Sequence, residues 1–164
     1  MNRKRWMAAI AGLVLVLAGV VAGRLAGGGS LAEVAEASPG EVVVYKSPTC
    51  GCCTGWVTHM REAGFEVRAV DTNDLAAAKV ELGVDPALQS CHTAVVDGYF
   101  VEGHVPAEQV RRLLEEQPDV AGLAVPGMPV GSPGMEGPDA RPYDVLAVSE
   151  EGEASVFARV DPRG

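Results

Sequence analysis

The sequence predicts an α/β domain in which helices flank a mixed β-sheet. Short β-type runs alternate with stretches whose apolar residues recur at helical spacing, which is typical of strand–helix–strand units. Asp97-Gly98 then marks a tight hairpin turn between two further strands, and an amphipathic helix follows the hairpin. The predicted order is strand, helix, strand, helix, strand, strand and helix, over residues 42–45, 56–63, 65–70, 75–82, 93–96, 99–102 and 106–117.

Turn and capping residues mark the ends of these elements. The first helix has one apolar face and ends at Gly64, a residue typical of helix C-termini. The polar run 71–74 supplies N-caps for the second helix, which Gly83 closes. Pro106 lies in the first turn of the last helix, and Pro118 stops that helix. Each boundary therefore has a local cause.

Residues 122–138 interrupt the pattern. They contain five glycines and four prolines, which preclude a helix or a central strand. Met128 and Met135 lie in similar settings within this Gly/Pro/Met loop. Two interpretations stay open: the methionines fill gaps against the core, or they are a pair of thioether ligands that select Cu(I). Apolar β-type runs at 143–148 and 154–160 then predict an added C-terminal hairpin.

Three cysteines lie where the first strand turns into the first helix, in the sequence Cys50-Gly-Cys52-Cys53. The unpaired N–H groups and the dipole at a helix N-terminus favour thiolates, which are nucleophiles and soft-metal ligands. Cys50 and Cys53 have the C-x-x-C spacing of a thioredoxin-like redox pair. Cys52 adds a third sulfur, which favours a thiophilic metal over simple thiol exchange. Three structural cysteines are the remaining alternative.

A fourth cysteine and two histidines belong to the second half of the predicted sheet. Cys91-His92-Thr93 forms the loop before the hairpin, and His104 follows the return strand. The order of elements and the cysteine turn resemble the thioredoxin fold, in which this loop faces the C-x-x-C pair and carries a cis-proline before a threonine. Here His92 stands in place of that proline. The resemblance implies that Cys91 and His92 face the first three thiols, while His104 is either a ligand or a structural histidine.

The N-terminus has the pattern of a targeting segment. Three basic residues precede an uncharged run over 7–23, and Arg24 follows it. We expect residues 1–24 to be a signal peptide or an N-terminal membrane anchor, with a buried core helix as the alternative. Residues 25–40 have the composition of a flexible tether, and residues 41–164 form the predicted folded domain. The domain would then be periplasmic or otherwise extracytoplasmic.

The charge of the chain limits its partners. The 164 residues carry a formal net charge of −9. Nucleic acid is excluded as a partner, because binding phosphates requires Lys and Arg, whereas an acidic domain is compatible with cations. No Ser–His–Asp constellation, phosphate loop or paired-carboxylate motif stands out in the sequence. Glu102 and Glu136 are expected to be solvated.

Four longer segments resemble the CopG-type copper-resistance proteins, a family of small exported bacterial proteins long described only as a domain of unknown function. The segments contain the cysteine turn, the Cys91-His92 loop, the His104 turn and the methionine loop, over residues 45–56, 90–99, 101–107 and 122–135. The resemblance implies a thioredoxin-like fold, a periplasmic location and a multi-copper, cysteine-bridged site that serves copper tolerance. It does not assign individual side chains to individual ions.

The leading hypothesis is therefore an exported, thioredoxin-like copper-binding domain with more than one copper ion per chain. Its candidate ligands are Cys50, Cys52, Cys53, Cys91, His92, His104, Met128 and Met135. Thiolate and thioether favour Cu(I) while imidazole tolerates Cu(II), so a mixed site could change the oxidation state of copper. The alternatives are a thiol–disulfide oxidoreductase using Cys50 and Cys53 and a structural zinc module. The expected partners are copper ions and other periplasmic copper-handling proteins, with the membrane contacted only through the N-terminal segment.

Overall fold

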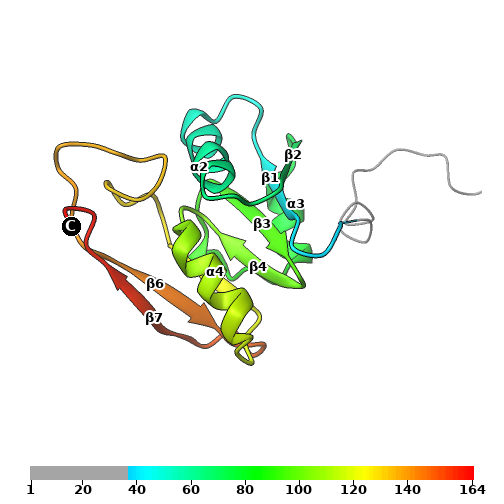
Figure 1. Cartoon of the computed structure of the whole chain (residues 1–164). Helices are drawn as coiled ribbons and strands as arrows, with labels where there is room; N and C mark the ends of the chain where they lie inside the picture. Colours follow the sequence, from blue (N-terminus) through cyan, green and yellow to red (C-terminus); the bar gives the residue numbers. More distant parts are fainter. Residues whose placement is uncertain (1–36) are drawn as a thin grey trace, which may run out of the picture.

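The computed structural model describes residues 37–164, which form one mixed β-sheet with helices packed on it (Figure 1). The seven strands of this part of the chain have the spatial order β2-β1-β3-β4-β5-β6-β7. The strands are β1 (Val42–Lys46), β2 (Val67–Asp71), β3 (His92–Val96), β4 (Tyr99–Glu102), β5 (Gly122–Ala124), β6 (Tyr143–Val148) and β7 (Ala154–Val160). The α-helices are α2 (Gly51–Glu62), α3 (Leu75–Glu81) and α4 (Ala107–Glu116), and a short 3-10 helix covers Pro86–Leu88. The predicted α/β class is confirmed.

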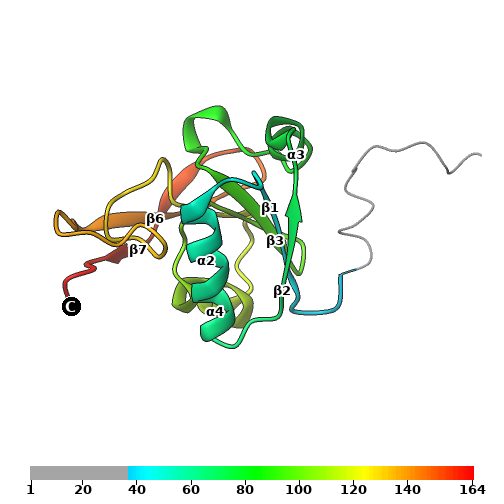
Figure 2. The same ribbon diagram turned by 90° about the horizontal axis from the view of Figure 1, so that it is seen from above.

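Two helices cover one face of the sheet and the third covers the other face (Figure 2). On the first face, Trp56 of α2 and Leu113 of α4 belong to the same buried cluster as Val44 of β1. On the opposite face, Ala78 of α3 packs against Val43 of β1. β1 pairs in parallel with β2 and antiparallel with β3, which forms a hairpin with β4. This half of the sheet therefore has the element order and layering that the thioredoxin-like prediction requires.

Local signals place the ends of the elements close to where the sequence predicts them. Asp74 caps α3, since its Oδ1 atom accepts a hydrogen bond from the Ala77 amide at 3.1 Å. Asp97 and Gly98 adopt φ angles of 46° and 87°, as a two-residue hairpin turn requires. Gly64 follows α2 with a φ of 91°. The predicted C-terminal hairpin is present as β6 and β7, which extend the sheet beyond β5.

The prediction that residues 122–138 contain no central strand is wrong at its first three residues. Gly122–Ala124 forms β5, which pairs in parallel with β4 and antiparallel with β6. Glycine permits this close pairing, because a Cβ at Gly122 would lie 2.2 Å from the Phe100 carbonyl oxygen. The prolines begin only at Pro126, so the irregular backbone follows the strand and does not include it.

The predicted N-terminal segments fall mostly outside the described residues. This applies to the signal peptide or anchor over 1–24 and to residues 25–36 of the predicted tether. Within residues 37–164, no helix has the length and apolar character needed to cross a membrane.

Candidate metal centre

The three cysteines at the start of α2 and Cys91 meet where two internal strands of the sheet, β1 and β3, have adjacent ends. Cys50 is the N-cap of α2, and Cys52 and Cys53 lie in its first turn. Cys91 immediately precedes β3, which runs antiparallel to β1. The end of β1 that leads into the cysteine turn therefore lies beside the start of β3. All four Sγ atoms lie within 4.8 Å of one another, so the expected convergence of the cysteines is confirmed.

The sulfur cluster contains one disulfide and two thiols. Cys50 and Cys53 are bonded to each other, while Cys52 and Cys91 are free. The Cys91 sulfur lies 3.7 Å from that of Cys52 and 3.5 Å from that of Cys53. The Cys50 and Cys52 sulfurs are 3.4 Å apart. Cys53 is fully buried and the other three cysteines are half-buried, so the cluster is accessible from the side of the turn.

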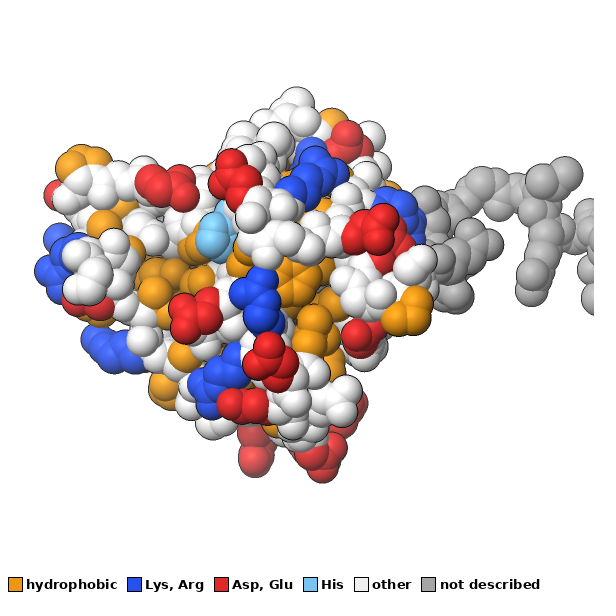
Figure 3. All heavy atoms as spheres, in the orientation of Figure 1, with side chains coloured by type: hydrophobic (Ala, Val, Ile, Leu, Met, Phe, Trp, Pro, Cys, Tyr) orange, Lys and Arg blue, Asp and Glu red, His pale blue; other side chains and the backbone are white. Residues whose placement is uncertain are grey.

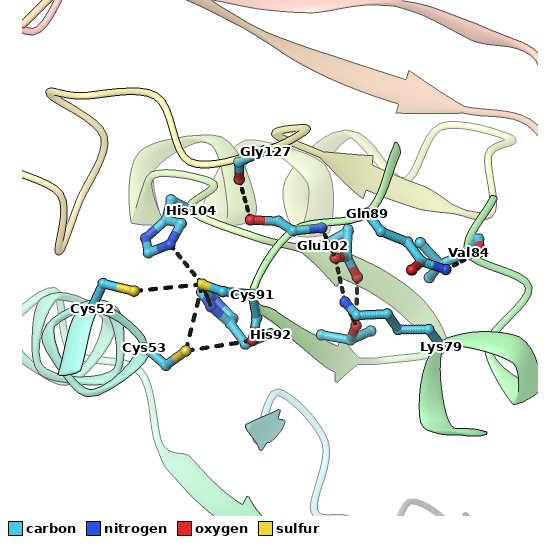
Figure 4. A network of polar contacts seen from close by, with 12 residues as sticks. Cys52, Cys53, Lys79, Val84, Gln89, Cys91, His92, Glu102, His104 and Gly127 are labelled. Atoms are coloured by element: carbon cyan, nitrogen blue, oxygen red, sulfur yellow. Dashed lines mark hydrogen bonds and ion pairs between the residues drawn. The ribbon is translucent and has the colours of Figure 1, made fainter. Parts of the chain in front are cut away.

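His104 directs an imidazole nitrogen at the same cluster (Figure 4). Its Nδ1 atom donates a hydrogen bond to the Pro133 carbonyl oxygen at 2.8 Å, since a carbonyl can only accept. In the neutral ring this leaves Nε2 unprotonated, and Nε2 lies 3.0 Å from the Cys91 sulfur. Burial lowers the pKa of His104, which favours this neutral form. Orientation by a carbonyl at the second ring nitrogen is usual for metal-binding histidines.

His92 is fully buried between two aromatic rings. Its ring centroid lies 4.6 Å from that of Trp56 and 4.9 Å from that of His104. Its Nδ1 atom is 3.4 Å from the Cys91 sulfur, and its Nε2 atom has no hydrogen-bond partner among the described residues. Burial, together with the charges of His104 and Lys79, lowers the pKa of His92 to about 3. Leaving a buried nitrogen unpaired costs about 1–3 kcal/mol, and the ring nitrogen that lies beside the Cys91 sulfur is Nδ1.

Cys91 remains a thiol when no metal is bound. Burial raises the pKa of its side chain to about 12, and the hydrogen bond and charge of Cys52 act in the same direction. A soft cation that binds Cys91 must therefore displace a proton, which makes metal affinity depend on pH. The predicted ease of thiol ionisation applies to the N-terminus of α2, and Cys91 lies outside that helix.

The loop that carries the two methionines is packed against the first turn of α2. A Cβ at Gly134 would lie 2.5 Å from the Cys52 carbonyl oxygen, so only glycine allows this approach. The adjacent Met135 is half-buried, whereas Met128 is 51% exposed. Thioether ligation by either methionine stays a prediction, and the burial of Met135 makes it the better candidate.

Comparison with known proteins identifies the family. A profile for a family described as "Protein of unknown function, DUF411" matches residues 88–135. A solved structure titled "Copper resistance protein copG- Form 2" is 46% identical in sequence, with a TM-score of 0.71 and coverage of 75% of this chain and 99% of that chain. This chain belongs to the CopG family. A second CopG structure, titled Form 1, is also 46% identical, with a TM-score of 0.70 and coverage of 75% and 98%. No curated protein matches the chain.

Membership of the CopG family confirms the resemblance drawn from the sequence segments. The range matched by the DUF411 profile contains Cys91, His92, His104 and both methionines. It begins after the cysteine turn, so it describes the half of the centre that is assembled from β3, β4 and the methionine loop.

In this CopG-family chain, a buried ion pair lies next to the Cys91 loop. Lys79 of α3 contacts Glu102 at the end of β4, and their side chains are 5% and 0% exposed. The expectation that Glu102 is solvated is therefore wrong, whereas Glu136 is exposed. Glu102 shares a face of β4 with the buried Phe100, and this alternation is the signal in the sequence that could have placed it inside. Sequence reasoning missed Lys79 as its partner.

Proposed function

We propose that this chain is an exported protein of copper resistance that binds copper in a cysteine-rich site holding more than one ion. The observation that carries the proposal is the position of the Cys91 sulfur. Two cysteine sulfurs and two imidazole nitrogens lie 3.0–3.7 Å from it. Thiolates select Cu(I), and imidazole also suits copper, so this donor set fits the copper-related function that the CopG relatives indicate.

The number of donors supports more than one ion. Metal–sulfur bonds of about 2.3 Å place two sulfur ligands of one tetrahedral ion roughly 3.8 Å apart. The Cys52 and Cys91 sulfurs are separated by 3.7 Å. One such ion uses four donors, whereas Cys91, the three other cysteines and the two histidines offer six. A sulfur of Cys91 that bridges two ions would accommodate this surplus.

Occupation of the whole site requires reduction of the disulfide. In the oxidised chain only two of the four cysteines, Cys52 and Cys91, keep a free sulfur for metal binding, because Cys50 and Cys53 are bonded to each other. A dithiol that reduces this bond supplies two electrons and two protons and frees two further sulfur ligands. We therefore expect the reduced chain to bind more Cu(I) than the oxidised chain.

A change in the oxidation state of copper is the second part of the proposal. The free thiols of Cys52 and Cys91 have their sulfurs 3.7 Å apart. Their oxidation to a disulfide would transfer two electrons to two Cu(II) ions, giving two Cu(I) ions and releasing two protons. Cu(II) is itself the oxidant in this step. Anaerobic addition of Cu(II) should then produce Cu(I), detected with a Cu(I)-specific chelator, in step with the loss of two thiols.

The decisive test is an anaerobic Cu(I) titration of the reduced chain. We expect more than one ion to bind, and we expect Cys52→Ser to lower that number. Thr58→Ala is the matched control, because Thr58 is exposed on the same helix and, within residues 37–164, its hydroxyl donates a hydrogen bond only to the Thr54 carbonyl oxygen. Binding of no copper, or an unchanged stoichiometry in Cys52→Ser, would refute the proposal. Metal analysis of protein produced with zinc and copper both present separates copper from the structural zinc alternative.

Thiol–disulfide exchange is a second candidate function, and the Cys50–Cys53 disulfide favours it. Half-buried Cys50 would be the attacking thiol, and buried Cys53 would be the resolving thiol. The Cys91 thiol argues against this function, because it lies 3.5 Å from Cys53 and would compete for a mixed disulfide. Copper-independent reduction of insulin, abolished by Cys50→Ser and unaffected by Met128→Ala, would favour it over copper binding.

An extracytoplasmic location completes the proposal. The basic and apolar N-terminal pattern supports export, and the net charge of −9 supports cations as ligands in place of nucleic acid. The partners would be copper ions and other copper-handling proteins of the same compartment, with the membrane contacted only through the N-terminal segment. Cell fractionation and mass spectrometry of the mature N-terminus test both the location and the fate of residues 1–24.

A further inference from the structure

A buried ion pair lies beside the proposed copper site, on the other side of the sheet from His92. Its members, Lys79 and Glu102, are 5% and 0% exposed. Thr93 contacts both of them and points away from the face occupied by its neighbour His92, because successive side chains of a strand alternate. The ring of His92 packs on Trp56 of α2. The ion pair is therefore separated from the copper ligands by the backbone of the sheet.

The carboxylate of Glu102 accepts hydrogen bonds from three segments of the chain (Figure 4). Lys79 donates from α3, the Thr93 hydroxyl donates from β3, and the Ser90 amide donates from the loop across 2.5 Å. An ionised carboxylate only accepts hydrogen bonds, so it can serve all three donors. Lys79 neutralises its charge in the low-dielectric interior.

The residues bonded to this carboxylate adjoin the proposed ligands. Ser90 precedes Cys91, and Glu102 lies two residues before His104. Gly103 has a φ of 71°, and a Cβ there would lie 2.5 Å from the Ser90 Cβ. The loop that holds Cys91 and the turn that holds His104 are thus packed together and joined through one side chain.

The Ser90 side chain extends the same network to the methionine loop. Its hydroxyl donates a hydrogen bond to the Gly127 carbonyl oxygen, and the Gly127 amide donates to the Gln89 carbonyl oxygen at 3.1 Å. Three segments that carry proposed ligands therefore meet at Ser90, whose own amide is held by Glu102. Apolar side chains of similar volume would often be as stabilising as a buried ion pair, so its particular contribution here is the placement of these segments.

We propose that Glu102, neutralised by Lys79, is a positioning residue for the copper site. It binds no metal, and it holds the two segments so that the Cys91 sulfur and His104 Nε2 stay 3.0 Å apart. The effect on copper rests on the proposed function, while the effect on the thiol rests only on the hydrogen bonds. Groups that orient metal ligands from outside typically change metal affinity by about 10–100-fold when they are mutated.

The deciding variant replaces the ion pair by apolar side chains, in the double substitution Lys79→Met and Glu102→Met. Volume is kept and no charge is left unpaired, so the fold should persist, while the acceptor for the Ser90 amide is lost. Thr93→Val removes a single donor to Glu102 and serves as the milder variant if the double variant does not fold. Circular dichroism and thermal unfolding establish which variants are folded.

The matched control removes another ion pair, through Glu41→Met with Arg68→Met. This pair is 14% and 31% exposed and lies at the opposite end of β1 from the cysteine turn. Loss of an ion pair in general would affect both double variants, whereas loss of positioning would affect only the Lys79–Glu102 variant.

Two measurements on the full chain separate this proposal from the copper function. The first is the alkylation rate of Cys91 by iodoacetamide in the metal-free protein, read by mass spectrometry. The second is Cu(I) affinity in competition with a chromophoric chelator, with the sulfur-to-copper absorption spectrum. We expect faster alkylation, Cu(I) binding weaker by about 10–100-fold and an altered spectrum, with the control variant unchanged.

The possible outcomes separate the positioning role of Glu102 from the copper function. An unchanged alkylation rate in a folded variant overturns the positioning role, and so does unchanged Cu(I) affinity with an unchanged spectrum. If the wild-type chain binds no copper but the variant alters Cys91 alkylation, the copper function is rejected and the positioning role is supported.

Discussion

The cysteine turn and the region from Ser90 to His104 hold one cluster by different means. In the turn, Cys50 caps α2 by accepting a hydrogen bond from the Cys53 amide at 3.4 Å, and the three cysteines lie within one helical turn. The other region combines the start of β3 with the end of β4, paired so that Thr93 lies opposite Glu102. One half of the centre thus depends on residues adjacent in sequence, and the other depends on sheet register.

The two regions also differ in their burial. Cys50 and Cys52 are half-buried in a turn with exposed neighbours, whereas His92 and His104 are fully buried. Acidic and basic side chains are interspersed over the face drawn in Figure 3, with no extended basic patch on it. The cysteine turn therefore makes the cluster accessible, whereas the region from Ser90 to His104 places its ligands rigidly in the interior.

The strongest test of this comparison removes one sulfur from each half. Cys91→Ser takes away the atom that has four other donors within 3.7 Å. We expect Cu(I) affinity to fall by more than about 100-fold, beyond the usual effect of residues outside the ligand set. Cys52→Ser should retain tighter binding with fewer ions. Chelator competition on both reduced variants measures the difference, and equal losses would show that Cys91 is not the central ligand.

Gly134→Ala tests whether the methionine loop is tied to the cysteine turn. Gly134 has a φ of 83°, and a Cβ there would lie 2.5 Å from the Cys52 carbonyl oxygen. Overpacking and backbone strain should lower the free energy of unfolding by about 1–3 kcal/mol, measured by urea denaturation of the metal-free protein. Gly51→Ala is the control, because a Cβ at that position would meet no atom within 4 Å among residues 37–164 apart from its chain neighbours and its own helix backbone. Equal stability of the two variants would contradict close packing of the loop.

The pH dependence of the stability of the metal-free protein tests the burial of His92 in the region from Ser90 to His104. Burial lowers the pKa of His92 to about 3, against about 6.5 in an unfolded chain. The unfolded state therefore binds a proton that the folded state does not, so stability falls as pH drops from about 6.5 toward 3, by up to about 1.4 kcal/mol per pH unit. Thermal unfolding across the upper part of this range measures the slope. His92→Phe keeps an aromatic ring beside Trp56 and should reduce the slope; an unchanged slope would refute the assignment.

Substitution of a methionine should have the smallest effect on Cu(I) affinity, and comparing the two positions shows which methionine lies closer to the copper site. Met135 is half-buried beside the contact with α2, whereas Met128 is 51% exposed. We expect Met135→Leu to weaken Cu(I) binding by less than about tenfold, which is below about 1.4 kcal/mol, and Met128→Leu to weaken it less. The same chelator competition measures both. A larger loss in Met128→Leu would reverse the assignment.

Much of the fold is predictable because its signals are local. Asp74, Asp97 and Gly98 cause the cap and the turn that they predict, since each acts on backbone within three residues of itself. The sequence does not predict β5, because the signal for this strand is not local. Gly122 looks like a loop residue, yet it belongs to a strand because the adjacent β4 lies too close for any side chain.

The candidate metal centre likewise has features that the sequence predicts and features that depend on packing. The residue types and the C-x-C-C spacing point to soft-metal or thiol chemistry, and the family resemblance adds Cys91 to the same cluster. The sequence leaves open which cysteines form a disulfide and whether His104 points at the sulfurs. It also gives no sign that Lys79 and Glu102 meet, because alternation along β4 can place Glu102 on a buried face but does not identify its partner.

Short stretches of the sequence thus determine the donor groups of the site and the local backbone conformation, because neighbouring residues act on one another directly. The approach of Cys91 to the cysteine turn, the orientation of His104 by Pro133 and the burial of Glu102 arise only when distant segments pack. Those contacts join residues that are as much as 39 positions apart, and their geometry depends on strand register and on the exclusion of water. Neither property can be read from one segment alone.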